Sequence, residues 1–303
     1  MLRQLRQSIT HALWERYLCA DPFMQQIVTL LQNLQVQKVM LDHFALIDLP
    51  GAHTGITHLS RFFSLLGYTE HGRGYLPDKQ NDFVWMRETN SETMPVADVL
   101  PQIVVADFRV DILPTEVKKV IEKYAKQAAV PPFAEITALL KRIQQNDSHA
   151  TAPLIKRYIQ YFAGRDWPLP SLKEFYTVCE FNELLAWVLV FGRQPNHFTL
   201  AVHLLNRFTD LADFNDHLTR HLNLKLNHDG GIIKGSEAVG IAQSATIGIP
   251  KRVKLSDTII EIPSSFVEFV WRYPRVAAPH LWQDFFTGFI PQQANHVIKS
   301  LYS

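Results

Sequence analysis

The order of the predicted elements constrains the fold of this chain more than any single residue does. An apolar strand at residues 39–47 is followed by a helix at 57–66 and by strands at 68–75, 83–87 and 103–110. The same order, a strand, a helix and then strands, returns after residue 193. Two such units predict one mixed sheet or half-barrel with helices packed on it, which belongs to the α+β class.

The second unit repeats the order but not the sequence. Its strands are predicted at 197–203, 243–249, 258–262 and 266–272, with a helix at 211–222. No close sequence repeat links it to the first unit, so the relation between the two units rests on element order alone.

Helical regions complete the chain. We expect a single domain over 1–303, made of four parts. These parts are N-terminal helices at 1–36, the first module at 37–112, a helical insert at 113–192, and the second module with a C-terminal segment at 193–303.

The charge balance and the longest apolar run exclude several classes of partner. The chain has 30 Lys and Arg against 29 Asp and Glu, so its net charge of +1 favours neither nucleic acid nor an anionic membrane. The longest apolar run, 184–191, is far shorter than the ~20 residues that span a bilayer. The charged N-terminus does not resemble a secretory signal, and a cytoplasmic protein is therefore expected. The sequence leaves the oligomeric state open.

The histidine and cysteine counts indicate which metal ligands the chain could offer. Two cysteines, Cys19 and Cys179, support neither a disulfide framework nor a cysteine zinc site. Thirteen histidines are present. A bound metal would therefore be held by imidazole and carboxylate groups.

Three predicted strands carry a metal-type ligand among apolar neighbours. They are His43 in the first strand, His197 at the start of the second module, and Glu268 in the last strand. Two histidines and one carboxylate form the facial set that leaves positions open for substrate and O₂ on Fe(II). The alternatives are a buried histidine bonded to backbone and a buried Glu268–Arg272 pair, and Glu261 is a rival carboxylate.

Several segments resemble one family in the order of the chain. Asp42-His43-Phe44-Ala45 resembles the D-H-x-A signature of the 2-oxoadipate dioxygenase/decarboxylase family, which belongs to the vicinal oxygen chelate superfamily that includes the glyoxalases. The other similar segments are Asn196-His197-Phe198-Thr199, the Gly-Gly and Lys-Gly-Ser stretch at 230–236, Gln243-Ser244-Ala245-Thr246, the strand at 263–272, and the closing segment at 288–300.

The resemblance implies a fold, a reaction and a ligand set. It implies a vicinal-oxygen-chelate-like half-barrel in which His43, His197 and Glu268 bind the metal, and it favours Glu268 over Glu261. It also implies that Fe(II) and O₂ convert a 2-oxo acid, 2-oxoadipate in the family, into 2-hydroxyglutarate and CO₂, in lysine catabolism.

One position departs from the family pattern. The family usually has an arginine four residues after the first histidine, where it can hold the substrate's distal carboxylate, whereas this chain has Ile47. By strand alternation Ile47 should line the same cavity as His43. Either another arginine replaces the missing one, or the substrate is different and less acidic. The candidate arginines are Arg272, Arg109, Arg73 and Arg193.

The resemblance also suggests further polar contacts to substrate. Gln243 and Ser244 are candidates, together with Arg272, while Lys234 is expected to be an exposed loop lysine. Two other functions remain open. The chain could be a metal-dependent lyase, isomerase or hydrolase of the same superfamily that uses Zn, Ni or Mn without O₂, or a ligand-binding protein with no turnover.

Overall fold

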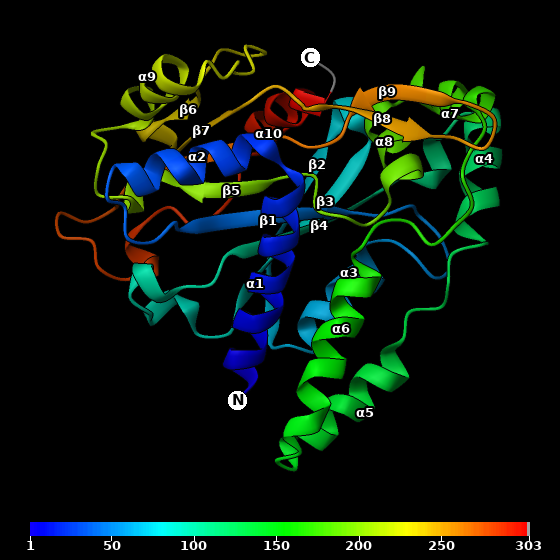
Figure 1. The fold of residues 1–303 in the computed structure, drawn as a ribbon, viewed down its shortest axis with the longest axis horizontal. Coiled ribbons are helices and arrows are strands. Elements are labelled where there is room, and N and C mark those ends of the chain that lie inside the picture. Colours follow the sequence, from blue (N-terminus) through cyan, green and yellow to red (C-terminus); the bar gives the residue numbers. More distant parts are fainter. Residues whose placement is uncertain (302–303) are drawn as a thin grey trace.

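A single curled sheet forms the centre of the computed structural model, which describes residues 1–301 (Figure 1). Its eight strands lie in the order β2-β3-β4-β1-β5-β10-β7-β6. The strand bounds are β1 Leu41–Ile47, β2 Tyr68–Leu76, β3 Asn81–Glu88, β4 Gln102–Phe108, β5 Phe198–Ala201, β6 Lys234–Ser236, β7 Ile241–Ala245 and β10 Glu268–Arg272.

The two halves of the sheet share one connectivity. In the first module β1 is parallel to β4, and β4, β3 and β2 are successively antiparallel. In the second module β5 is parallel to β10, and β10, β7 and β6 are successively antiparallel. The modules join at the centre, where β1 and β5 are antiparallel. The predicted pair of related units in one mixed half-barrel sheet is confirmed.

One predicted strand lies outside this sheet. Residues 258–262 form β9 (Ile259–Pro263), which pairs with β8 (Pro250–Lys254) in a separate hairpin between β7 and β10. Sequence analysis did not predict β8, whose exposed, charged residues lack the alternation of a half-buried strand. Glu261, the rival carboxylate, lies exposed on this hairpin.

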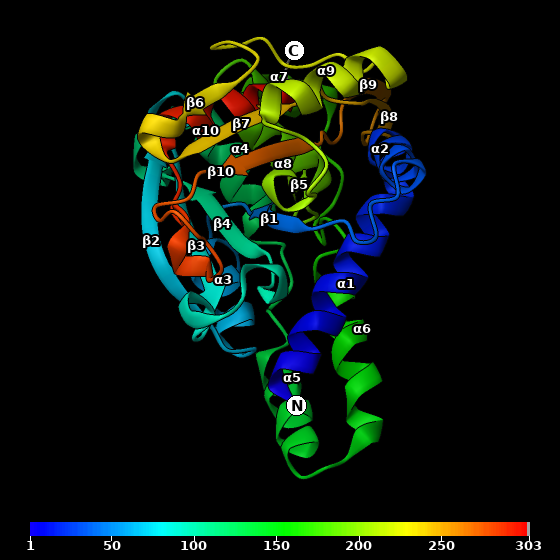
Figure 2. The same cartoon turned by 90° about the vertical axis from the view of Figure 1, so that its left-hand side faces the viewer.

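Strand alternation divides the core between the two faces of the sheet. On β1, Phe44 and Leu46 point to one face and His43, Ala45 and Ile47 to the other. The first face packs against a helical layer, most of which lies beside and below the sheet in Figure 2, with its last helix above the sheet. This layer comprises α1 (Leu2–Ala20), α2 (Pro22–Asn33), α3 (Ile56–Ser64), α5 (Phe133–Gln144), α6 (Thr151–Tyr161) and α9 (Leu211–Leu222).

The opposite, concave face is filled by the remaining helices. They are α4 (Thr115–Ala125), α7 (Leu172–Cys179), α8 (Glu183–Phe191) and α10 (Pro291–Ile298). From Leu184 onward α8 is buried on every side, as its continuous apolar sequence requires. Helix α10 contacts β2 at one end of the sheet and β6 and β7 at the other. It therefore closes the open side of the half-barrel over the face that carries His43.

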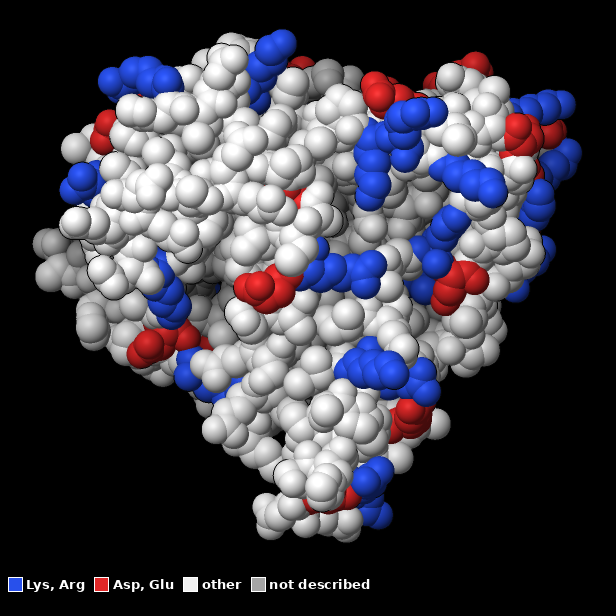
Figure 3. Space-filling view, viewed as in Figure 1, with Lys and Arg blue, Asp and Glu red and all other residues white. Residues whose placement is uncertain are grey.

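The surface agrees with the near-zero net charge. On the face in Figure 3, Lys and Arg side chains are spread with Asp and Glu side chains among them. Within residues 1–301, no helix has the length and hydrophobicity needed to cross a bilayer.

Candidate metal site and its cavity

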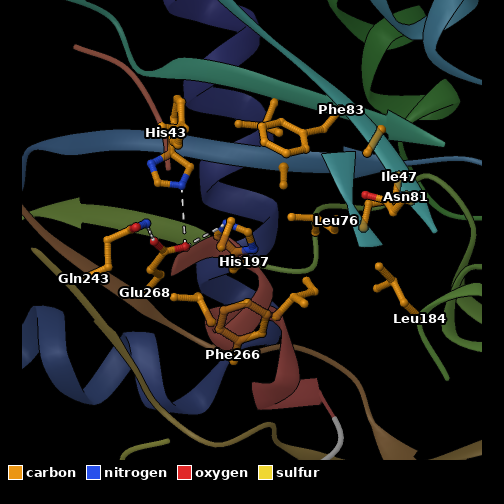
Figure 4. Close-up of a pocket in the computed structure, with 17 residues that line it drawn as sticks. His43, Ile47, Leu76, Asn81, Phe83, Leu184, His197, Gln243, Phe266 and Glu268 are labelled. Carbon is orange, nitrogen blue, oxygen red and sulfur yellow. Dashed lines mark hydrogen bonds and ion pairs between the residues drawn. The ribbon is translucent and has the colours of Figure 1, made fainter. Parts of the chain in front are cut away.

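His43, His197 and Glu268 converge on one point of the concave face. All three are buried, and one ligand atom of each lies within 4.8 Å of the others. Oε2 of Glu268 lies 3.5 Å from Nε2 of His43 and 3.1 Å from Nε2 of His197. Figure 4 shows both imidazoles pointing at this carboxylate. The structure thus brings together the three residues that the sequence predicts as metal ligands, each in a different predicted strand.

The register of the three central strands explains this convergence. His43 on β1 pairs with Thr199 on β5, and Thr199 pairs in turn with Glu268 on β10. His197 lies two residues before Thr199, so its side chain leaves the same face. It stands directly before β5, and His203, predicted to end that strand, lies in the 3₁₀ turn Val202–Leu204 outside the cavity.

Each histidine is oriented by the residue that precedes it. Nδ1 of His43 lies 2.7 Å from Oδ1 of Asp42, and Nδ1 of His197 lies 2.8 Å from Oδ1 of Asn196. An acceptor at Nδ1 places the proton there and leaves Nε2 with its lone pair toward the shared point. This pairing fixes both rings in the tautomer that a metal requires.

Arg272 makes contacts within the protein and does not line the cavity. Its guanidinium is fully buried and holds both oxygens of Asp42, at 2.6 and 2.8 Å, and it also donates to the carbonyls of Phe286 and Gly288. The suggestion that Arg272 contacts substrate is therefore contradicted, because Arg272 does not line the cavity and its guanidinium is bonded to Asp42 and the two carbonyls. The alternative of a Glu268–Arg272 pair is also contradicted, since the partner of Arg272 is Asp42.

Burial and mutual charge set the protonation of the cluster. Burial alone would raise the pKa of Glu268, but His43 and His197 outweigh it and hold the pKa well below its usual value. Burial alone would lower the pKa of His43, but Glu268 and Asp42 raise it to about 9. Burial lowers the pKa of His197. Without a metal the cluster thus pairs a carboxylate with one neutral and one protonated imidazole, and His43 would release the proton on Nε2 when it binds a cation.

The donor set fits a divalent metal. Nε2 of His197 is buried and, despite its proximity to Glu268, lacks an aligned hydrogen bond. Gln243 donates from Nε2 to Oε1 of Glu268, so Oε2 is the oxygen left facing the imidazoles. Two imidazole nitrogens and one carboxylate oxygen suit Fe(II), Mn(II), Ni(II) or Zn(II). His43, His197 and Glu268 could hold such an ion.

A cavity extends from the cluster across the concave face. Ile47 and Gln243 line it with the three candidate ligands, as strand alternation predicts for Ile47. Ser244 does not line it. Its Oγ donates to Oδ1 of Asn215 on α9, at 2.8 Å, because neighbouring residues of β7 point to opposite faces. The prediction that Ser244 contacts substrate is wrong for that reason.

None of the four candidate arginines reaches the cavity. Each is held by carboxylates elsewhere, so the expectation that one of them replaces the missing arginine is contradicted. Arg73 pairs with Glu70, Arg109 with Asp82, Arg193 with Asp48 and Asp166, and Arg272 with Asp42.

Lys234 is also placed differently from the expectation of an exposed loop lysine. It lies in β6 and is buried, and its Nζ donates to the carbonyl of Asn227 at 2.7 Å. Pairing of β6 with β7 draws this segment into the sheet.

Several cavity residues were not found from the sequence. Phe289 packs edge-on against His43 with ring centroids 4.8 Å apart, and Phe266 stacks on His197 at 4.7 Å. Leu184 and Asn81 come from the insert and from the start of β3. Alternation in the predicted strand at 266–272 places Phe266 on the face of Glu268. No spacing in the sequence marks the other three residues, because they reach the cavity through the packing of distant elements.

The family is decided by comparison with known proteins. The sequence model of the 2-oxoadipate dioxygenase/decarboxylase family matches residues 10–282. The chain belongs to this family. Among curated proteins it is 27% identical over 261 residues to "2-oxoadipate dioxygenase/decarboxylase, chloroplastic" of Arabidopsis thaliana, which covers 84% of the chain. The chain spans about two thirds of that relative, 65% of its length.

Solved structures share the fold of this family member. The hydroxyglutarate synthase of Oryza sativa, solved in complex with 2-oxoadipate, has a TM-score of 0.78 at 22% identity and covers 99% of this chain and 93% of its own. A glyoxalase superfamily protein from Ralstonia eutropha has a TM-score of 0.79 at 18% identity over 95% of this chain and 87% of its own. The vicinal-oxygen-chelate-like half-barrel is thus confirmed.

Proposed function

We propose that this protein is a non-haem Fe(II)-dependent dioxygenase/decarboxylase. It would convert a 2-oxo acid and O₂ into CO₂ and the 2-hydroxy acid that is one carbon shorter. The observation that carries the proposal is the buried cluster of His43, His197 and Glu268, which lines one side of a cavity. Membership of the family supports the same reaction.

The metal and the protein have separate tasks in this reaction. When bound, Fe(II) supplies open coordination positions for the keto oxygen and carboxylate of the 2-oxo acid and for O₂. Asp42 and Asn196 keep both Nε2 atoms aimed at the metal position, and Gln243 keeps Glu268 in place. Such fixed ligands hold the reacting groups in one geometry.

The aromatic rings beside the histidines exclude water. Phe289 and Phe266 cover the two imidazoles. A dry pocket strengthens the interaction of the substrate's charged head with its ligands and protects reactive species from water.

The cytoplasmic location and a place in lysine catabolism stay predictions.

Oxygen consumption tests the proposal. The anaerobically purified protein is loaded with Fe(II), and O₂ uptake and CO₂ release are measured with a panel of 2-oxo acids. We expect equal amounts of O₂ consumed and CO₂ released, and neither in His43→Ala. Conversion without O₂ would indicate a lyase, isomerase or hydrolase that uses Zn, Ni or Mn. Binding without conversion would indicate a ligand-binding protein.

A further inference from the structure

The side chains that line the cavity are polar beside the metal cluster and mostly apolar farther from it. His43, His197, Glu268 and Gln243 stand at one side, whereas apolar side chains line the other side (Figure 4). The apolar residues labelled on that side are Ile47, Leu76, Phe83 and Leu184. A 2-oxo acid whose head is held at the cluster must therefore direct its tail into an apolar region.

Among the described residues, no lysine or arginine lines this cavity. A tail that ended in a carboxylate would lose its hydration there and find no cation to replace it. Burial of an uncompensated charge is strongly unfavourable, whereas burial of an alkyl tail is favourable in proportion to its area.

The one polar side chain at the apolar end does not supply a charge. Asn81 is buried and donates from its Nδ2 to the carbonyl of Asp107, at 2.8 Å. The second hydrogen of its amide could donate to a carboxylate, but a neutral amide supplies no positive charge to offset a buried anion. Lys79, in the 3₁₀ turn between Leu76 and Asn81, has its ammonium 2.8 Å from Oε2 of Glu183 and so is already matched by a carboxylate.

We propose that the substrate of this protein is a 2-oxo acid with an uncharged, apolar tail rather than a 2-oxo dicarboxylic acid. This inference rests on the proposed function and narrows its substrate class. The balanced reaction is R-CH₂-CO-COOH + O₂ → R-CH(OH)-COOH + CO₂, in which R is an alkyl or aryl group. The bond from the carboxyl carbon to the keto carbon breaks, and the carboxyl group leaves as CO₂. One atom of O₂ joins the keto carbon, which becomes the new carboxyl group, and the other enters a C–H bond of the neighbouring CH₂ and forms the hydroxyl group. The substrate thus loses four electrons, which O₂ accepts.

A matched pair of compounds tests the proposal directly. 2-Oxohexanoate and 2-oxoadipate have the same six-carbon chain and differ by a methyl group in place of the distal carboxylate. Their binding to the Fe(II)-loaded protein is measured by calorimetry without O₂, and turnover is then measured with O₂. We expect 2-oxohexanoate to bind at least about 30-fold more tightly, the factor that an unpaired buried charge implies.

A substitution at Ile47 should reverse the preference. Ile47→Arg places a cation on the cavity wall, so 2-oxoadipate should gain affinity relative to 2-oxohexanoate. Ile47→Met changes the shape of the same wall without a charge and should keep the preference for 2-oxohexanoate. The measurement on the unchanged protein decides the question if Ile47→Arg does not fold.

The outcomes separate this inference from the proposed function. Equal or tighter binding of 2-oxoadipate, with O₂ consumed, overturns the apolar-tail inference alone. Loss of that binding of 2-oxoadipate in Lys79→Met would then show that Lys79 holds the distal carboxylate. Preferential binding of 2-oxohexanoate without O₂ consumption supports the apolar cavity and overturns the oxygenase. Binding of neither compound overturns both.

Discussion

The two modules have the same topology but contribute different chemistry to one cavity. Strand β10 of the second module lies beside β5 and carries Glu268, whereas the corresponding strand β4 of the first module presents Val104 and Ala106 to the cavity. The second module therefore supplies most of the metal cluster, and the first module supplies about half of the apolar residues that line the cavity. Two modules of the same topology can thus contribute a metal ligand at one strand position and an apolar side chain at the corresponding one, because each position is free to carry either kind of side chain.

The modules also differ in how they support their histidines. In the first module Asp42 orients His43 and is itself held by Arg272, which reaches across from the second module. In the second module the neutral amide of Asn196 orients His197. The support of His43 is thus a buried ion pair that links the two modules, whereas the support of His197 is local.

The largest expected effect concerns Glu268 on β10, compared with Val104 at the corresponding position of β4. Glu268→Ala removes the carboxylate of the candidate ligand set, and we expect the affinity for Fe(II) to fall by at least about 100-fold. Val104→Ala removes only apolar contacts and should bind metal normally. Metal content after anaerobic loading and gel filtration measures both variants. Full occupancy in Glu268→Ala would refute the assignment of the cluster.

The next effect tests the charged support of His43. Asp42→Asn leaves the buried guanidinium of Arg272 without its carboxylate, and we expect the free energy of unfolding to fall by about 3–5 kcal/mol. Chemical denaturation of the metal-free protein measures this loss. An unchanged midpoint would mean that the ion pair contributes nothing to stability. Asp147→Asn is a control, because its arginine partner is solvent-exposed.

A smaller effect is expected at the neutral support of His197. Asn196→Leu removes the acceptor at Nδ1, so we expect a loss of about 10- to 100-fold in metal affinity with a loss of only about 1–3 kcal/mol in stability. Metal titration and denaturation of the same variant give both values. A stability loss as large as that of Asp42→Asn would remove the distinction between the two supports.

The smallest expected effect concerns the outer strands of the two modules, because β6 carries a buried lysine and β2 does not. Burial lowers the pKa of Lys234 on β6 from its usual 10.5 to about 8, while β2 carries no lysine. Between these pH values the unfolded chain holds the proton and the native chain does not, so this group makes stability rise with pH. Lys234→Met should flatten that rise. Denaturation between pH 7.5 and 10.5 measures it, and an unchanged slope would contradict the assignment.

Local patterning predicted much of the fold. The apolar strand around His43, the helix ahead of Gly67 and the element order of both modules were readable because alternation and helical spacing act over a few residues. The hairpin β8–β9 and the short strand at Lys234 were not readable, because exposed or short strands lack a strong pattern and depend on their partners.

The sequence by itself determined the three candidate ligands and the order of the elements that carry them. It also placed Ile47 beside His43, since the period of a strand fixes which side chains share a face. Only the tertiary structure decided which residues the polar side chains contact. Arg272 turned out to hold Asp42, and Ser244 to face α9, because contacts between distant strands depend on register and packing that no local pattern records.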